Sequence, residues 1–332
     1  MYGIISNSLF ALLTAFAVSA AACPAIIPVL RFLHTGRKSA EGPDGVRTVP
    51  SMGGIVILAA LAVSTLLWGR DSYSFVLIAL LLCCAFAMIG FLDDFLRTTR
   101  KQDEGLRPWQ RITLETVFSL VFSYWLYRAD PAGPVLWPGK LNLGILYVPF
   151  AALVILACVS SVRVTDAFGG LAATVTGGYS MSLSVLLCVS VVTAAAAADP
   201  ERLEDMSALS AFAAGTMGGS LGFLLYNTPP AKVKPGSTGS MLLGAAVGAM
   251  ALMSHTVPML PLMGFCFLAS AATSALRFIL RKKLPGSGEK KDVPLLSRMR
   301  SKGMPESKIV TVFGVITVIC GAAALLLYWF LK

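Results

Sequence analysis

Long apolar stretches separated by short polar segments run through the whole 332-residue chain. A helix needs roughly 20 apolar residues to cross the hydrocarbon core of a bilayer, and ten stretches approach that length. They are residues 6–30, 52–69, 74–92, 110–128, 142–161, 171–197, 207–226, 239–254, 257–280 and 309–331. The pattern predicts an all-α polytopic membrane protein, a single domain over residues 1–332 with about ten transmembrane helices.

Lys and Arg residues concentrate in alternate gaps between these stretches. Gaps on one side hold 22 of the 27 basic residues, and the other side holds the remaining five. Those five are Arg70, Arg128, Lys140, Arg202 and Lys332. Because basic loops stay in the cytoplasm, the split predicts a multi-pass protein with both termini outside. The net charge of +10 then reflects contact with anionic membrane lipids and does not indicate nucleic acid.

Composition excludes an ordinary soluble protein. Hydrophobic residues make up 56% of the chain and charged residues only 13%, whereas soluble domains are about a quarter charged. All seven cysteines fall in the apolar stretches, and none has metal-ligand spacing with a histidine. We therefore interpret them as small packing residues.

Two adjacent carboxylates, Asp93 and Asp94, follow the third apolar stretch. A charged side chain at membrane depth is costly, so it marks a candidate functional site. Two carboxylates where a helix leaves the membrane suit a divalent cation or a base acting on an anionic substrate. The competing interpretation is that both carboxylates are simply solvated at the helix end.

Several unusual segments fall in the predicted cytoplasmic loops. They are TVPSMGG at 48–54, GFLDDFLRTTRKQDEGLRPWQ at 90–110, SSVRVTDAFGGLA at 160–172, PPAKVKPGSTGSMLLG at 229–244 and KGMPESKI at 302–309. Glycine-rich turns and acids gathered on one face favour an active or binding site there. Residues 281–307 mix Gly, Pro, Ser and charge, which predicts a flexible cytoplasmic loop.

These segments resemble, in the same order, the motifs of the polyprenyl-phosphate N-acetylhexosamine-1-phosphate transferase family. The family motifs are GTPTMGG, GFxDDxxK followed by GLRxWQ, N-x-x-N-x-x-D-x-x-D-G-L, PAxVFMGDxGS and KGWPEPKV, and the resemblance covers nearly the whole chain. It is closest to the branch that makes the first lipid-linked precursor of peptidoglycan. The resemblance implies a bacterial cytoplasmic-membrane enzyme that moves a phospho-sugar from a UDP-sugar to polyprenyl phosphate with Mg²⁺. It also implies a homodimer.

The resemblance assigns roles to particular residues. Asp93, Asp94 and Asp166 would be the catalytic and metal-holding carboxylates. The substrate-binding candidates are Arg47, Arg163, Lys232, Arg298 and Arg300.

The chain departs from the family pattern where the chemistry lies. Ser160 and Arg163 stand where the family has asparagines, and Gly169 and Ser237 stand where it has aspartates. A run of family histidines corresponds to Leu296, Ser297 and Arg298. Because Mg²⁺ affinity depends on ligand charge and geometry, these losses make Mg²⁺ binding doubtful and predict impaired or absent transfer.

Two interpretations of the gained arginines remain open. Arg163 could neutralise Asp166, three residues away on a helical turn, together with Asp93 and Asp94. Alternatively, the arginines could bind the phosphate of a polyprenyl lipid without a metal, since a guanidinium holds phosphate through two parallel hydrogen bonds. Glu115 is expected either to snorkel toward the membrane surface or to pair with Arg111 at the i,i+4 spacing.

The leading hypothesis is a catalytically impaired member that binds polyprenyl phosphate or a cell-wall partner. Its rival is an active transferase with a rearranged site, in which Asp93, Asp94 and Asp166 hold Mg²⁺ and arginines bind the pyrophosphate of a UDP-sugar. A transporter or flippase is a third class, but the chain lacks the broken mid-membrane helices typical of transporters.

Overall fold

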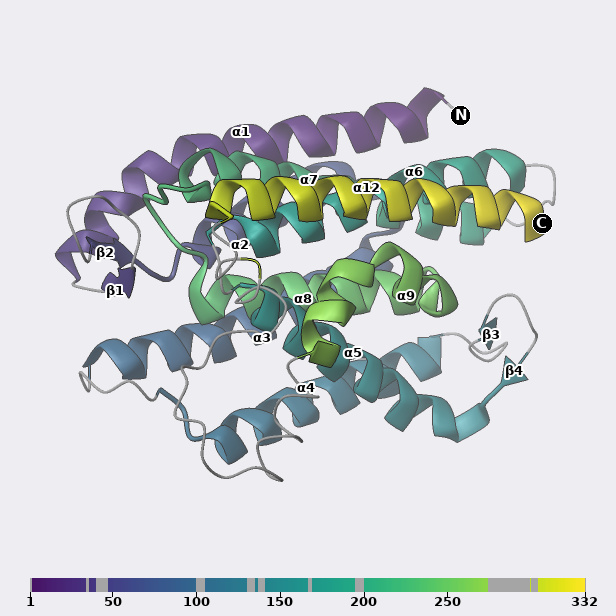
Figure 1. Ribbon diagram of the computed structural model, residues 1–332. Coiled ribbons are helices and arrows are strands. Elements are labelled where there is room, and N and C mark those ends of the chain that lie inside the picture. The colour runs from purple at the N-terminus through teal and green to yellow at the C-terminus, as the bar shows by residue number, and fades with distance from the viewer. Residues whose placement is uncertain are drawn as a thin grey trace.

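The chain folds into a bundle of long helices with two small hairpins (Figure 1). The computed structural model describes residues 2–33, 36–39, 47–99, 105–129, 135–136, 141–166, 169–194, 200–273, 299 and 304–331. The helices are α1 Tyr2–Phe32, α2 Gly54–Trp68, α3 Tyr73–Thr99, α4 Pro108–Ala129, α5 Tyr147–Thr165, α6 Leu171–Ala194, α7 Pro200–Asn227, α8 Gly236–Met253, α9 Leu260–Met263 and α12 Glu306–Leu331. The predicted loop at 281–307 lies almost entirely outside the described residues.

The all-α membrane architecture is confirmed, and each predicted stretch overlaps a described helix. Within the described part of the chain, seven helices are long and apolar enough to cross a membrane. They are α1, α3, α5, α6, α7, α8 and α12. Helix α2 is shorter, at 15 residues. Of the ten predicted spans, seven are therefore supported by a described helix of sufficient length.

Helix α3 continues past its predicted end at residue 92 and stops at Thr99. Residues 92–99 contain no Gly or Pro, and Arg97 reaches back to Asp93 across one helical turn, at 3.1 Å. An i,i+4 pair of opposite charges stabilises a helix. The aspartate pair therefore lies inside α3, and the expectation that it marks the helix end is wrong.

Two antiparallel hairpins were not predicted. Strand β1 (Gly36–Ser39) pairs with β2 (Arg47–Pro50), with Gly36 opposite Pro50. Strand β3 (Val135–Leu136) pairs with β4 (Leu141–Asn142). Neither hairpin shows the alternation of apolar and polar residues by which a strand is recognised in sequence.

Helix α8 forms the centre of the bundle, and all 18 of its residues are buried. Glycines let its neighbours approach closely. A Cβ on Gly54 of α2 would lie 2.2 Å from the Gly239 backbone, and one on Gly90 of α3 would lie 2.4 Å from the Ser237 carbonyl oxygen. Small residues allow such backbone contact between membrane helices. Helices α2 and α3 are thus held against the start of α8.

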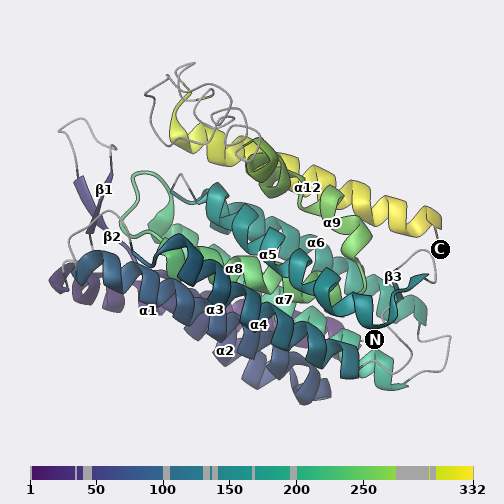
Figure 2. The same ribbon diagram turned by 90° about the horizontal axis from the view of Figure 1, so that it is seen from below.

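The two ends of the bundle differ. Both views place the two termini and the β3–β4 hairpin at one end and the β1–β2 hairpin at the other (Figures 1 and 2). Figure 2 also shows α12 along one edge of the bundle. This arrangement agrees with the predicted grouping of alternate gaps. The assignment of the β1–β2 end to the cytoplasm stays a prediction.

Candidate functional site

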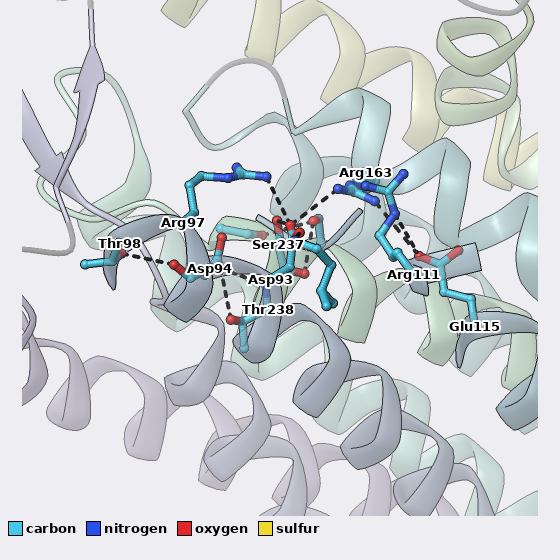
Figure 3. Close-up of polar contacts among 12 residues, drawn as sticks. Asp93, Asp94, Arg97, Thr98, Arg111, Glu115, Arg163, Ser237 and Thr238 are labelled. Carbon is cyan, nitrogen blue, oxygen red and sulfur yellow. Dashed lines mark hydrogen bonds and ion pairs between the residues drawn. The ribbon is translucent and has the colours of Figure 1, made fainter. Parts of the chain in front are cut away.

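The end of α3, the start of α4, the end of α5 and the start of α8 meet at the end of the bundle opposite the termini (Figures 1 and 3). Asp93 lies at the centre of this junction and is fully buried. Its Oδ2 accepts a hydrogen bond from Ser237 Oγ at 2.7 Å. A buried carboxylate requires several donors, and the surrounding residues supply them.

Three further donors complete the surroundings of Asp93. Arg97 lies 3.1 Å from Oδ2, Arg163 lies 3.5 Å from the same oxygen, and the Leu106 backbone N–H donates to Oδ1 at 3.0 Å. The last contact fastens the segment before α4 to α3. Both oxygens of Asp93 are therefore engaged by the protein itself.

Asp94 binds the N-terminus of α8. Its Oδ2 accepts the Thr238 backbone N–H at 3.1 Å and the Thr238 hydroxyl at 3.0 Å. Exposed N–H groups and the helix dipole make such an end favourable for a negative charge. Gly236, with a positive φ of 72°, allows this approach, since a Cβ there would lie 2.5 Å from Asp94 Oδ2.

The aspartate pair is thus not solvated. Asp93 is 0% exposed and Asp94 is 4% exposed, so the interpretation that both carboxylates lie in water at a helix end is wrong. Together the two side chains join α3 to α8 through Ser237 and Thr238 (Figure 3).

A second group of charges adjoins Asp93 on the α4 and α5 side. Arg111 Nε lies 3.5 Å from Glu115 Oε1, which confirms the predicted i,i+4 pair. Arg163 NH1 lies 3.9 Å from the same Glu115 oxygen. Arg163 therefore lies between Asp93 and Glu115, which agrees with the interpretation that it neutralises Asp93, while its predicted pairing with Asp94 and Asp166 stays a prediction. Its side chain keeps 22% of its surface exposed.

The structure brings together only part of the predicted site. Asp93, Asp94, Arg163 and Ser237 meet, as described above. Asp166 follows α5 as its C-cap, where its N–H donates to the Val162 carbonyl oxygen at 3.1 Å, and it is half-buried.

Other predicted positions contribute differently. Ser160 is exposed on α5, and Lys232 is exposed in the segment before α8. Gly169 is buried, and a Cβ there would lie 3.1 Å from the Asn227 carbonyl oxygen. Arg47 is in β2, and nothing is described of its side chain. Outside the described residues lie Leu296, Ser297, Arg298 and Arg300.

These residues do not fit a magnesium site. Mg²⁺ takes carboxylate oxygens in near-octahedral geometry, but the oxygens of Asp93 already face four protein donors, two of them cationic. A family aspartate at position 237 would place a second carboxylate beside Asp93 and require a cation between them. Ser237 supplies a neutral donor instead. Over the described ranges, no three Asp, Glu, His or Cys side chains are grouped as metal ligands.

The sequence did not predict the hydrogen-bond donors to the aspartates, which are the Ser237 hydroxyl, Thr238 and the Leu106 N–H. One signal was available, because a serine and a threonine stand next to each other in the very motif where the family has its aspartate. The backbone contact joins Leu106 to a carboxylate 13 residues earlier in the chain, and no local pattern encodes it.

The fold and the junction describe a membrane-embedded helical protein whose site is built around the paired aspartates of α3. A protein-family model for glycosyl transferase family 4 matches residues 76–255, which span α3 to α8. The chain belongs to this family.

Relatives match along almost the whole chain. A phospho-N-acetylmuramoyl-pentapeptide-transferase of Heliobacterium modesticaldum is 33% identical over 96% of this chain and 97% of its own length. The protein of that name from Ruegeria pomeroyi is 33% identical over 84% of this chain and 80% of its own. The one from Clostridioides difficile is 31% identical over 95% and 96%. The resemblance found in the loop motifs is therefore confirmed.

Proposed function

We propose that this protein acts in the lipid-linked stage of peptidoglycan precursor synthesis as a binder of polyprenyl phosphate that does not transfer a phospho-sugar. The observation that carries the proposal is the 2.7 Å hydrogen bond from Ser237 to Asp93. That bond replaces a carboxylate-to-metal contact with an internal one. The packing of the helices, and with it a lipid-binding surface, would be kept, while the Asp93 carboxylate that would bind metal is hydrogen-bonded by the protein itself.

The arginines at the junction support capture of a phosphate. Arg97, Arg111 and Arg163 each keep between 22% and 25% of the side chain exposed. Their ion-pair partners are Asp93 and Glu115, and with Asp94 beside them the junction has three guanidinium groups and three carboxylates. A guanidinium fork binds phosphate without a metal, so these partly exposed arginines suit a lipid monophosphate.

The lipid phosphate would bind at one particular face of the membrane. The described part of the first basic gap, the β1–β2 hairpin, lies at the end of the bundle opposite the termini, where the junction also lies. Positive loops stay in the cytoplasm, so the phosphate would be met at the inner face of a bacterial cytoplasmic membrane, with both termini outside.

Binding is tested with the full-length protein in lipid nanodiscs containing EDTA, with undecaprenyl phosphate detected by native mass spectrometry. We expect binding, and we expect Arg163→Ala to weaken it by about tenfold or more, because a charge-assisted hydrogen bond contributes roughly 1.5–3 kcal/mol. Arg128→Ala, at the exposed far end of α4, is the matched control and should bind normally. Absent binding, or equal binding by Arg163→Ala, would refute the proposal.

An active transferase with a rearranged site is the second candidate. It is favoured by Asp94, because the Thr238 backbone N–H and hydroxyl that bind its Oδ2 are neutral donors, unlike the arginines at Asp93. UMP release from UDP-MurNAc-pentapeptide or UDP-GlcNAc, with undecaprenyl phosphate and Mg²⁺, separates the two. We expect no release. Turnover that Asp94→Asn abolishes would establish the transferase and overturn the non-catalytic proposal.

A further inference from the structure

Four polar side chains follow one line along α4, away from the aspartate junction. They are Arg111, Glu115, Ser119 and Ser123, each four residues from the next. Residues at this spacing form a continuous ridge on a helix. The ridge rises about 18 Å at 1.5 Å per residue. Glu115, Ser119 and Ser123 are at most 5% exposed, so neighbouring helices cover this part of the ridge.

Every member of this α4 ridge has a buried polar atom without a hydrogen-bond partner among the residues that the structure describes. The atoms are Arg111 Nε, Glu115 Oε1, Ser119 Oγ and Ser123 Oγ. Elsewhere on the same helix, the hydroxyls of Thr113 and Thr116 donate to the carbonyl oxygens four residues earlier, at 2.8 Å and 2.7 Å. The two buried serines lack this bond. Buried polar groups without partners are rare in folded proteins and call for an explanation such as bound water.

The ion pairs at the start of the ridge are long. Arg111 Nε and Glu115 Oε1 are 3.5 Å apart, and Arg163 NH1 lies 3.9 Å from that oxygen. Neither contact is a hydrogen bond, and a polar contact of this length commonly has a water molecule at its edge. The charges therefore indicate water at the end of the ridge where the bundle meets solvent.

We propose that a file of ordered water molecules occupies the α4 ridge, from the Arg111–Glu115 pair to Ser123. Each water would bridge neighbouring ridge atoms, as buried water does where polar groups converge. The file ends beside Phe122 and Leu126, two buried apolar residues of α4. This site takes water only, and it does not depend on the proposed lipid function.

The water file gives Glu115 hydrogen bonds that the arginines do not supply. An anion that drew Arg163 toward itself would otherwise leave Glu115 buried without compensation, which is strongly unfavourable. Water along the ridge keeps the carboxylate solvated in either arrangement of Arg163. The arginines are therefore free to rearrange at the junction.

Thermal unfolding of the full-length protein in detergent tests the water file, because the direction of the change in melting temperature depends on whether the serines bind water. If Ser119 and Ser123 bind water, then Ser119→Ala and Ser123→Ala should each lower the melting temperature by about 2 °C or more. Thr113→Ala, which removes a hydroxyl from an exposed position of the same helix, is the control and should change it by less. Unchanged or higher melting temperatures in both serine variants would overturn the proposal, since removal of a dry, unpaired hydroxyl costs nothing.

A second measurement covers variants that fail to fold. Radiolytic hydroxyl-radical labelling with mass spectrometry modifies side chains beside bound water even where bulk solvent is excluded. We expect labelling of Phe122 in the wild-type protein, lost in the Ser119→Ala, Ser123→Ala double variant. Absence of labelling at Phe122 in the folded wild-type protein would overturn the proposal.

Discussion

The aspartate junction and the α4 ridge lie side by side, yet they treat their polar atoms in opposite ways. At the junction, Asp93 and Asp94 accept hydrogen bonds from Leu106, Ser237 and Thr238, and Asp93 forms ion pairs with two arginines. Along the ridge, four polar side chains at i,i+4 spacing each keep a buried atom that has no hydrogen bond within the described part of the chain. A carboxylate with protein donors on both oxygens holds helices together, whereas the buried atoms of the ridge need water to complete their hydrogen bonds. The aspartate motif that identifies the family therefore joins helices here, and the buried atoms that still need hydrogen bonds lie beside it on α4.

The largest effect is expected from Asp93→Ala. This change removes the common partner of Arg97, Arg163 and Ser237, and breaking a buried ion pair typically costs about 3–5 kcal/mol. We expect a large fall in the melting temperature or loss of folded protein in detergent. Asp93→Asn keeps an acceptor and should lose less. Equal stability of Asp93→Ala and wild type would show that the junction does not hold α3 to α8.

Ser237→Asp should convert the saturated junction into one that needs a cation. Two carboxylates within hydrogen-bond distance repel each other, so we expect a loss of about 1–3 kcal/mol in EDTA. Added Mg²⁺ or Mn²⁺ should restore part of the melting temperature in this variant and leave the wild type unchanged. A wild-type shift as large as that of the variant would mean that Asp93 already binds metal.

A smaller effect is expected from Thr238→Val, which removes the hydroxyl donor to Asp94 and keeps the backbone N–H. One hydrogen bond to a buried group contributes about 0.5–1.5 kcal/mol, so unfolding should shift by a corresponding few degrees. Thr238→Ser, which keeps the hydroxyl, serves as the control. If both variants melt alike, the Thr238 hydroxyl contributes nothing to the α3–α8 contact.

The smallest effect is expected at Thr65, a buried residue of α2 whose hydroxyl also lacks a partner but stands apart from the ridge. Thr65→Val has nearly the same shape and removes an unsatisfied group, so unfolding free energy should stay within about 0.5 kcal/mol or rise. A clear loss in the Thr65→Val unfolding curve would show that isolated buried hydroxyls here are hydrated too, and the ridge would no longer be special.

The sequence predicted the helices and the members of the junction better than their contacts. Apolar length alone identified the long helices, because hydrocarbon thickness imposes it. The Arg111–Glu115 pair followed from helical spacing. By contrast, the burial of Asp93 depends on Leu106, Arg163 and Ser237, which come from three other parts of the chain. The end of α3 at Thr99 was missed because the prediction relied on apolar residues, while the last turns are stabilised by charge.

The enclosed position of α8 bears on how the protein is made. Its neighbours α2, α3 and α5 precede it in the chain, so they enter the membrane before residues 236–253 have been synthesised. The earlier helices therefore cannot complete their contacts with this central helix until α8 arrives. Asp94 is in the same state, since the helix terminus that neutralises it is supplied only then. Completion of the bundle and burial of the aspartate pair are a single late event in biogenesis.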